Sequence, residues 1–210
     1  MVDYAHEVLE QIMSLGSSTI FEASGIKNSA LDRNIRTLWD GAVVAGPAYP
    51  VACAPGDNLA IHIAMEKAPA GSILVVTTDS FIAGYWGEIL TVAAVAAGIK
   101  GLIIDGGVRD IAAIRRHQFP IYCRGISVHG THKDSVNSVG QPIQIAGTPV
   151  RVGDLVTADD DGVVVLPQAC VTEVIRKGLA REQKEAVMMK QIIEGKTSLE
   201  LMNLTAWRDT

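Results

Sequence analysis

Two acidic residues and one arginine in the middle of the chain are the side chains best suited to chemistry. Glu88 follows Tyr85-Trp86-Gly87, and 20 residues (89–108) separate it from the pair Arg109-Asp110. An arginine beside a helix N-terminus makes a good carboxylate site, because its guanidinium fork and the free backbone N–H groups all donate hydrogen bonds. A neighbouring aspartate can hold a hard divalent cation such as Mg²⁺ or Mn²⁺. The pattern therefore indicates a site that binds a small anion together with a metal ion.

Each of these residues also has an ordinary structural explanation. Asp110 could cap the helix that follows it, Arg109 could pair with a surface acid, and Glu88 could stabilise its own helix as a first-turn acid. Two successive helix starts that each carry an acid favour the functional interpretation. Together they would supply anion donors, a fixed cation, a metal ligand and a second carboxylate to handle protons.

The surrounding segments must bring these two helix starts together. Gly87–Ala97 is rich in alanine and predicts a helix that ends at Gly98. Gly101–Asp105 predicts a short buried strand, Gly106-Gly107 a tight turn, and Val108–His117 a helix with Arg109 and Asp110 in its first turn. The result would be a helix–strand–helix unit of α/β type.

The rest of the chain predicts further helices and short strands. The N-terminal half predicts helices at 5–15, 17–25 and 59–67, strands at 41–45 and 72–77, and a turn-rich segment at 47–50. The C-terminal half predicts strands at 120–124, 142–145, 148–150, 154–157 and 162–166, followed by a long charged helix at 171–194.

Composition narrows the class of protein. Hydrophobic residues make up 48% of the 210 residues and aromatic residues only 5%, so the core must consist mainly of aliphatic side chains. The net charge of −5 and the lack of a basic cluster argue against nucleic-acid binding. No segment approaches the roughly 18 continuous apolar residues of a membrane helix. The three cysteines form no CxxC pair and the N-terminus is polar, so we expect reduced thiols and a cytoplasmic protein.

Several motifs together resemble one family. The acid-x20-Arg-Asp spacing, the Trp86-Gly87-Glu88 segment, Gly106–Asp110 (GGVRD), Pro55–Asn58 (PGDN) and Val152–Leu155 (VGDL) are similar to those of the class II pyruvate aldolases. These enzymes share a fold with the regulators of ribonuclease activity A, the RraA proteins. The similarity covers nearly the whole chain.

The resemblance implies a fold and an assembly. The fold would be an α/β, layered β/β/α swivelling domain with a C-terminal helix, assembling as a trimer that is sometimes paired into a hexamer. Residues 1–170 would form the catalytic domain. Residues 171–210 would form a helical tail that packs on a neighbouring subunit.

The resemblance also implies roles for individual residues. Asp110 would ligate Mg²⁺ or Mn²⁺, Arg109 would bind a 2-oxo acid and stabilise its enolate, and Glu88 would position a proton-relaying water. A glutamate of a neighbouring C-terminal helix, Glu185 or else Glu182, would approach the metal through water. The backbone of Gly87, Glu88, Ile89 and Leu90 would receive the substrate carboxylate.

The implied activity is that of a metal-dependent carbon–carbon lyase. The enzyme would cleave 4-hydroxy-4-methyl-2-oxoglutarate or a related 2-oxo acid to pyruvate, with oxaloacetate decarboxylation as a side activity. No lysine is placed for a Schiff base, which favours the metal route. No strand–helix junction carries GxGxxG, which argues against nucleotide-dependent chemistry. His129 and His132 could line the pocket entrance, although loop histidines are more often solvated. The alternative is a non-catalytic regulator that binds an RNA-degrading endonuclease.

Overall fold

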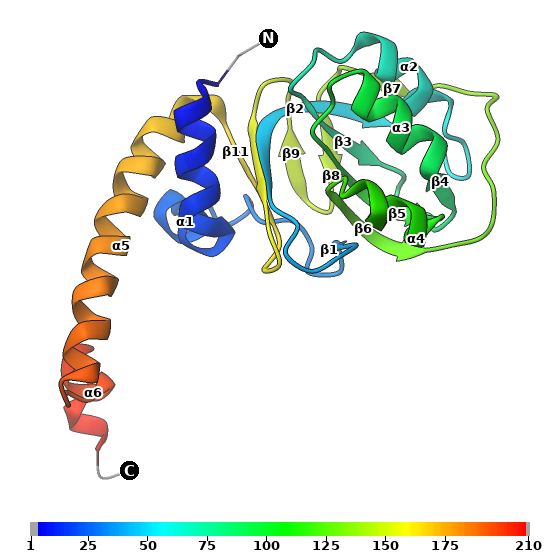
Figure 1. Cartoon of the computed structure of the whole chain (residues 1–210). Helices are drawn as coiled ribbons and strands as arrows, with labels where there is room; N and C mark the ends of the chain where they lie inside the picture. Colours follow the sequence, from blue (N-terminus) through cyan, green and yellow to red (C-terminus); the bar gives the residue numbers. More distant parts are fainter. Residues whose placement is uncertain (1–3, 209–210) are drawn as a thin grey trace.

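A curled mixed sheet of nine strands forms the centre of the protein in the computed structural model, which describes residues 4–208 (Figure 1). The strands are ordered β1-β6-β5-β3-β2-β10-β11, with β4 paired to β5 and β7 paired to β2. Strands β2, β3, β5 and β6 run parallel, whereas β1, β7, β10 and β11 pair antiparallel with their neighbours. The bounds are β1 Arg36–Thr37, β2 Val44–Ala52, β3 Ile73–Thr77, β4 Gly84–Trp86, β5 Gly101–Val108, β6 Ile121–Ile126, β7 Ser138–Val139, β10 Leu155–Ala158 and β11 Val163–Leu166.

Helices and a hairpin cover the two faces of the sheet. Helices α2 (Leu59–Lys67), α3 (Glu88–Ala96) and α4 (Ile111–His117) lie together on one face, and the hairpin of β8 (Ile143–Ile145) and β9 (Thr148–Val150) lies on the other (Figure 1). Buried residues of that hairpin pack with residues of β2, β3 and β5 in one apolar cluster. This layering confirms the α/β, β/β/α fold that the sequence resemblance implied.

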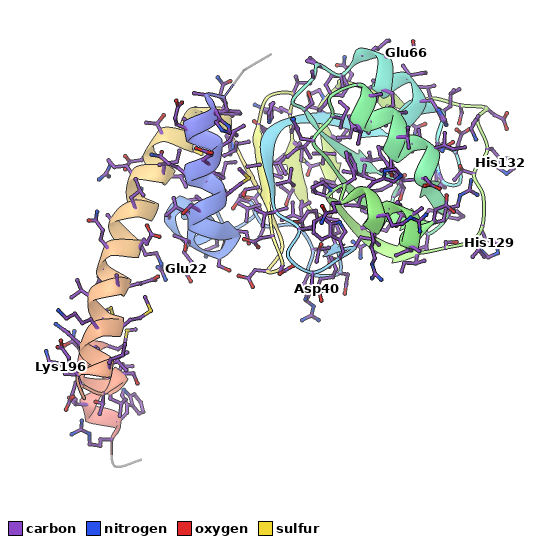
Figure 2. The ribbon with its side chains drawn as sticks, viewed as in Figure 1. Glu22, Asp40, Glu66, His129, His132 and Lys196 are labelled. Atoms are coloured by element: carbon purple, nitrogen blue, oxygen red, sulfur yellow. The ribbon has the colours of Figure 1, made fainter. Side chains whose placement is uncertain are left out.

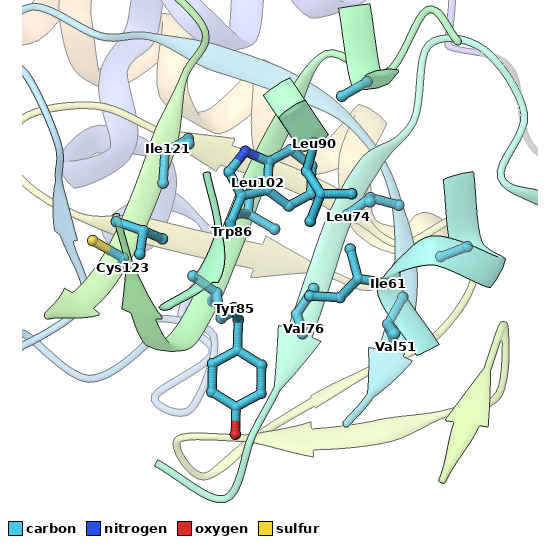
Figure 3. Packing of buried hydrophobic residues seen from close by; sticks show 14 of the residues in the cluster. Val51, Ile61, Leu74, Val76, Tyr85, Trp86, Leu90, Leu102, Ile121 and Cys123 are labelled. Atoms are coloured by element: carbon cyan, nitrogen blue, oxygen red, sulfur yellow. The ribbon is translucent and has the colours of Figure 1, made fainter. Parts of the chain in front are cut away.

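The helical face holds a cluster of fully buried aliphatic and aromatic side chains, shown in part in Figure 3. Trp86 stacks on Phe119 with ring centroids 5.8 Å apart, and its Nε1–H donates a 2.8 Å hydrogen bond to Thr91 Oγ1. Tyr85, which precedes Trp86 in the sequence, and Leu90, which follows it, belong to the same buried cluster. The segment that leads into α3 is therefore fixed by its own buried side chains.

The N- and C-terminal helices pack against each other at the β10–β11 end of the sheet. Helix α1 (His6–Ser24) changes direction at Gly16, whose φ of 77° breaks the helix as the sequence predicted. Helix α5 (Val171–Ile193) buries Val174 and Gly178 of its first half beside α1 and then extends away from the body (Figure 1). The short helix α6 (Ser198–Leu201) follows at its far end. Docking of this tail on another subunit stays a prediction.

The structure corrects two of the predicted elements. Residues 47–50 are part of strand β2 and not a turn, because β2 pairs with β10 over residues 44–47 and with β3 over residues 48–52. Each half of β2 thus has one main partner strand. The strand can therefore include Pro47 and Pro50, which have no backbone N–H to donate.

The second correction concerns the chain leading to Arg109. Gly106 and Gly107 do not form a turn, since β5 continues through them to Val108, and helix α4 begins only at Ile111. A Cβ on Gly106 would meet Thr78 Oγ1 at 2.7 Å and one on Gly107 would meet the Ala83 carbonyl at 2.5 Å. The two glycines serve close packing of the chain. Arg109 and Asp110 therefore precede the helix and do not lie in its first turn.

None of the helices between residues 4 and 208 has the length and apolar character needed to span a membrane.

Candidate active site

The starts of α3 and α4 meet at the end of β5. The backbone N–H of Glu88 donates a 3.1 Å hydrogen bond to Asp110 Oδ2, and the N–H of Arg109 donates a 2.8 Å bond to the Trp86 carbonyl. Strand β4 pairs in parallel with β5 through Trp86 and Val108, which delivers both segments to the same edge of the sheet. Glu88, Arg109 and Asp110 are thus neighbours at the end of β5 and the start of α3.

Asp110 adopts a left-handed backbone conformation with φ of 59°. Few side chains adopt this conformation readily, but aspartate and asparagine tolerate it better than most. Asp110 is the N-cap of α4, yet no side-chain capping bond to α4 is formed, and its carboxylate accepts from the start of α3 instead. The capping explanation considered from the sequence does not describe this residue.

Gly87 makes the approach of Asp110 possible. A Cβ atom built on Gly87 would collide with Asp110 Oδ2 and would lie 3.3 Å from Arg109 Cγ. Any side chain at position 87 would push the arginine–aspartate pair away from the start of α3.

A cavity of about 170 Å³ opens beside these residues. Gly87, Ile89, Leu90, Arg109 and Asp110 of the predicted site line it. The first residues of α3 carry N–H groups that have no partner within their own helix, so this wall offers donors to an anion. Other lining residues were not singled out from the sequence: Asn58, His62, Gly84, Tyr85, Gly130, Thr131 and Lys133.

The charges around the cavity favour an anionic ligand. Arg109 and Lys133 both line it, and the Arg109 side chain is 47% exposed. Burial, with a smaller effect from the charge of Lys133, lowers the pKa of His62, which keeps the imidazole neutral near pH 7. Arg109 Nε lies 3.8 Å from Asp110 Oδ2. This ion pair leaves the other N–H donors of the guanidinium available to a ligand.

The backbone of Glu88 lies at the site, whereas its carboxylate points toward α4. Glu88 Oε1 lies 3.2 Å from His117 Nε2 and 4.0 Å from Arg116. The Glu88 side chain is 46% exposed, and this residue is not among those that line the cavity. Its N–H, which we expected to bind the substrate carboxylate, donates to Asp110 Oδ2 instead.

Glu185 lies on α5, on the opposite side of the molecule from α3 and α4 (Figure 1). It pairs with Arg181 at 2.7 Å, and Arg181 also pairs with Glu22 of α1. Glu185 of the same chain therefore does not reach Asp110. Its predicted role requires a second copy of the chain.

The donor set around Asp110 suits a hard cation that keeps most of its waters. Within residues 4–208 no group of three or more His, Cys, Asp or Glu side chains gathers as a metal cage. Mg²⁺ commonly binds through one or two carboxylates and completes its shell with water and substrate oxygens. Asp110 Oδ2 accepts one backbone N–H, which leaves further lone pairs of the carboxylate for a cation.

Three of the residues missed from the sequence lie on one irregular segment. Residues 127–135 form a loop between β6 and β7 with no helix and no paired strand beyond a single bridge at His132. Gly130, Thr131 and Lys133 of this loop line the cavity, whereas His129 and His132 do not. Both histidines lie at the outer edge of the molecule (Figure 2). No hydrophobic period marks such a segment, and the sequence singled out His129 and His132, rather than their neighbours, as candidates for the pocket entrance.

Fold and site together define an α/β protein with a small pocket suited to an anion and a hard cation. Residues 7–165 match the sequence profile of the RraA-like family, described as Aldolase/RraA. A protein of Halalkalibacterium halodurans, provisionally named a 4-hydroxy-4-methyl-2-oxoglutarate aldolase, is 31% identical over 188 residues, which cover 89% of each chain. The chain belongs to the RraA-like family.

Solved structures with the same fold carry different descriptions. An uncharacterised protein of Pseudomonas syringae superimposes with a TM-score of 0.82 at 29% identity, covering 94% of this chain and 97% of the other. RraAS2 of Streptomyces coelicolor, described as an unusual member of the RNase ES inhibitor RraA protein family, superimposes with a TM-score of 0.81 at 27% identity, covering 90% of this chain and all of the other. The family thus includes proteins named as aldolases and proteins named as ribonuclease inhibitors.

Proposed function

We propose that this protein is a divalent-metal-dependent aldolase that cleaves 4-hydroxy-2-oxo acids such as 4-hydroxy-4-methyl-2-oxoglutarate to pyruvate. The observation that carries the proposal is the meeting of Arg109 and Asp110 with the first turn of α3 around one small cavity. An inhibitory surface has no need of a guanidinium, a left-handed aspartate and unpaired helix donors directed at the same space. The aldolase name of the Halalkalibacterium relative supports the same activity.

The substrate's 2-oxo acid end fits the charged wall of the cavity. Its carboxylate accepts hydrogen bonds from the backbone at Ile89 and Leu90, and the Arg109 guanidinium stabilises negative charge as it develops on the 2-oxo oxygen. Asp110 would hold a divalent cation, which would supply Lewis-acid stabilisation of this charge worth several kcal/mol.

Bond cleavage also requires proton transfers. The proton of the 4-hydroxyl group is removed, the C3–C4 bond breaks with formation of a carbonyl group at C4, and C3 of the pyruvate enolate accepts a proton. A water held by Glu88 is a suitable carrier for both protons. In this role the Glu88 carboxylate leaves His117 and turns to the mouth of the cavity. Loss of CO₂ from oxaloacetate produces the same enolate, so decarboxylation accompanies aldol cleavage.

A homotrimer or hexamer completes the proposed enzyme. Helix α5 extends from the body (Figure 1), and Glu185 lies on the second half of this helix. In such an assembly Glu185 would contribute, through water, to holding the metal of a neighbouring copy.

The experiment is a substrate screen coupled to lactate dehydrogenase. Purified protein is tested with 4-hydroxy-4-methyl-2-oxoglutarate and with oxaloacetate, with added Mg²⁺ or Mn²⁺ and with a chelator. The proposal expects pyruvate release that depends on the metal and stops with the chelator. Release that continues unchanged in the chelator contradicts the metal route.

The likeness to RraAS2 favours one alternative, a regulator that binds an RNA-degrading endonuclease. A pull-down distinguishes the two functions. Tight binding of the endonuclease, with no turnover of any 2-oxo acid in the coupled assay, would replace the aldolase proposal with the regulator.

A further inference from the structure

The loop of residues 127–135, here called the pocket loop, forms one wall of the cavity without secondary structure of its own. It contributes Gly130, Thr131 and Lys133 to the cavity lining. A Cβ atom on Gly130 would lie 3.8 Å from an Arg109 guanidinium nitrogen, so the loop faces the proposed anion-binding group directly. Its position must come from individual hydrogen bonds to the rest of the protein.

Backbone bonds hold the pocket loop at its first half and at its middle. The N–H of Gly84 donates to the His129 carbonyl at 2.7 Å. The N–H of His132 donates to the Gly56 carbonyl at 2.8 Å, and the N–H of Asn58 donates to the His132 carbonyl at 3.0 Å. The cavity-lining residues 130 and 131 lie between these two attachments.

Asp57 holds the last part of the pocket loop with its side chain. Its Oδ2 accepts from the N–H of Asp134 at 2.7 Å, from the N–H of Ser135 at 2.8 Å and from the Ser135 hydroxyl at 3.1 Å. Its Oδ1 accepts from the N–H of Leu59 at 2.9 Å, at the start of α2. Asp57 is 5% exposed. One buried carboxylate therefore ties the loop to the helical layer of the fold.

The chemistry of these bonds requires the ionised form. Four donors converge on the two oxygens, and hydrogen bonds to a carboxylate are about twice as strong as those between neutral groups. An asparagine has the same shape but a single acceptor oxygen, and its NH₂ group would face donors on the other side. One oxygen cannot accept from donors on both sides, and a neutral acceptor binds more weakly than a carboxylate, so asparagine should weaken the attachment of the loop.

We propose that Asp57 is a positioning residue that sets substrate specificity by fixing the pocket loop over Arg109. This inference rests on the proposed aldolase function. The wall formed by α3, Arg109 and Asp110 receives the pyruvyl end of the substrate, which every 2-oxo acid shares. The pocket loop encloses the part of the substrate beyond C3, which differs between 2-oxo acids. Asp57 therefore acts on recognition of the distal part and not on the enolate chemistry.

The test compares two reactions of the same site. Exchange of the pyruvate methyl protons in D₂O, followed by NMR, needs only the pyruvyl end, whereas cleavage of 4-hydroxy-4-methyl-2-oxoglutarate needs both ends. Asp57→Asn and Asp57→Ala are expected to raise KM for cleavage at least about tenfold and to change pyruvate exchange less than about threefold, the pattern of lost ground-state binding. An equal fall in both reactions, or no change in either, overturns the proposal.

Asp154→Asn is the matched control. Asp154 also braces a turn, since its Oδ2 accepts from the N–H of Arg151 at 2.8 Å, but it does not line the cavity. It should leave both reactions unchanged.

Hydrogen–deuterium exchange separates this inference from the proposed function. The amides of residues 134 and 135 should exchange faster in Asp57→Asn than in the wild type, and at the wild-type rate in Asp154→Asn. Unchanged protection in Asp57→Asn overturns the positioning role. The wild type could also prove unable to cleave 2-oxo acids or to exchange pyruvate protons. If the amides of Asp57→Asn still exchanged faster, the loop attachment would stand, but the aldolase proposal and the specificity role would both be rejected.

Discussion

The N–H of Glu88 donates a 3.1 Å hydrogen bond to Oδ2 of Asp110, a residue 22 positions further along the chain. This bond joins the start of α3 to the end of β5, and it sets Arg109 beside the unpaired donors of α3. The parallel pairing of β4 with β5 brings the two segments together, and Gly87 leaves room for the carboxylate. The proposed chemistry depends on this one contact region.

Replacement of Arg109 tests the anion-binding group. Arg109→Ala and Arg109→Lys should each lower kcat/KM for pyruvate release by at least about 10²-fold, the scale of losing one electrostatic group that stabilises a transition state. Lysine should not rescue the activity because it lacks the planar fork. The coupled assay measures the loss, and Arg33→Ala, an exposed position outside the cavity lining, serves as the control. Full activity of Arg109→Lys would show that only charge matters.

Addition of one methyl group at Gly87 tests the close approach of Asp110. Gly87→Ala should displace the carboxylate and reduce turnover by roughly 10²-fold, the effect of a misplacement of about 1 Å in an active site. The fold should survive, as judged by circular dichroism and thermal unfolding. Gly125→Ala is the control, because a Cβ there would lie at ordinary contact distances of 3.6 and 3.7 Å from Ile82. Wild-type turnover in Gly87→Ala would contradict the geometry.

The buried bond between Trp86 and Thr91 should contribute to stability and not to chemistry. Thr91 is fully buried, and Thr91→Val leaves the indole N–H of Trp86 without its acceptor. The free energy of unfolding should fall by about 1–3 kcal/mol, measured by urea denaturation. In a Trp86→Phe background the same substitution should cost at least about 0.5 kcal/mol less, as a double-mutant cycle would reveal. Equal costs in both backgrounds would mean that the bond contributes nothing.

Asp57 should make stability depend on pH in the acid range. The N–H of Leu59, followed by the N–H groups of Asp134 and Ser135, lowers the pKa of Asp57 from 3.8 to about 2. A lowered carboxyl pKa stabilises the folded state above pH 3.8, and this contribution disappears as the pH falls toward 2. The wild type should therefore exceed Asp57→Asn in urea midpoint at neutral pH, with the difference shrinking between these two pH values. A difference that stays constant or grows on acidification would contradict the assignment.

The sequence predicts most of the helices and strands because their patterns are local. The Ala-rich segment before Gly98 is a helix, the β-branched run ending at Thr77 is a buried strand, and Gly16 breaks α1. The predicted turn at Gly106-Gly107 was wrong because glycine occurs both in turns and where the chain packs closely. Only the fold shows that Thr78 and Ala83 lie too close to these two residues for a side chain.

The candidate site was predictable only where its residues follow regular elements. Glu88, Arg109 and Asp110 stand next to a helix start or a strand end, so their spacing carries information about their location. Lys133 and Thr131 lie on a loop whose position depends on the Asp57 carboxylate, 74 or more residues earlier in the chain. Such long-range attachments leave no periodic signal in the sequence.

The metal-dependent turnover of Asp110→Asn tests whether the Asp110 carboxylate holds the catalytic cation. Asparagine tolerates the left-handed backbone at this position and can still accept the N–H of Glu88, so the substitution removes the charge and little else. We expect that, with Mn²⁺ supplied, pyruvate release from 4-hydroxy-4-methyl-2-oxoglutarate falls at least about 10²-fold and that Mn²⁺ binding weakens. Wild-type turnover by Asp110→Asn, insensitive to a chelator, would contradict this role of the carboxylate.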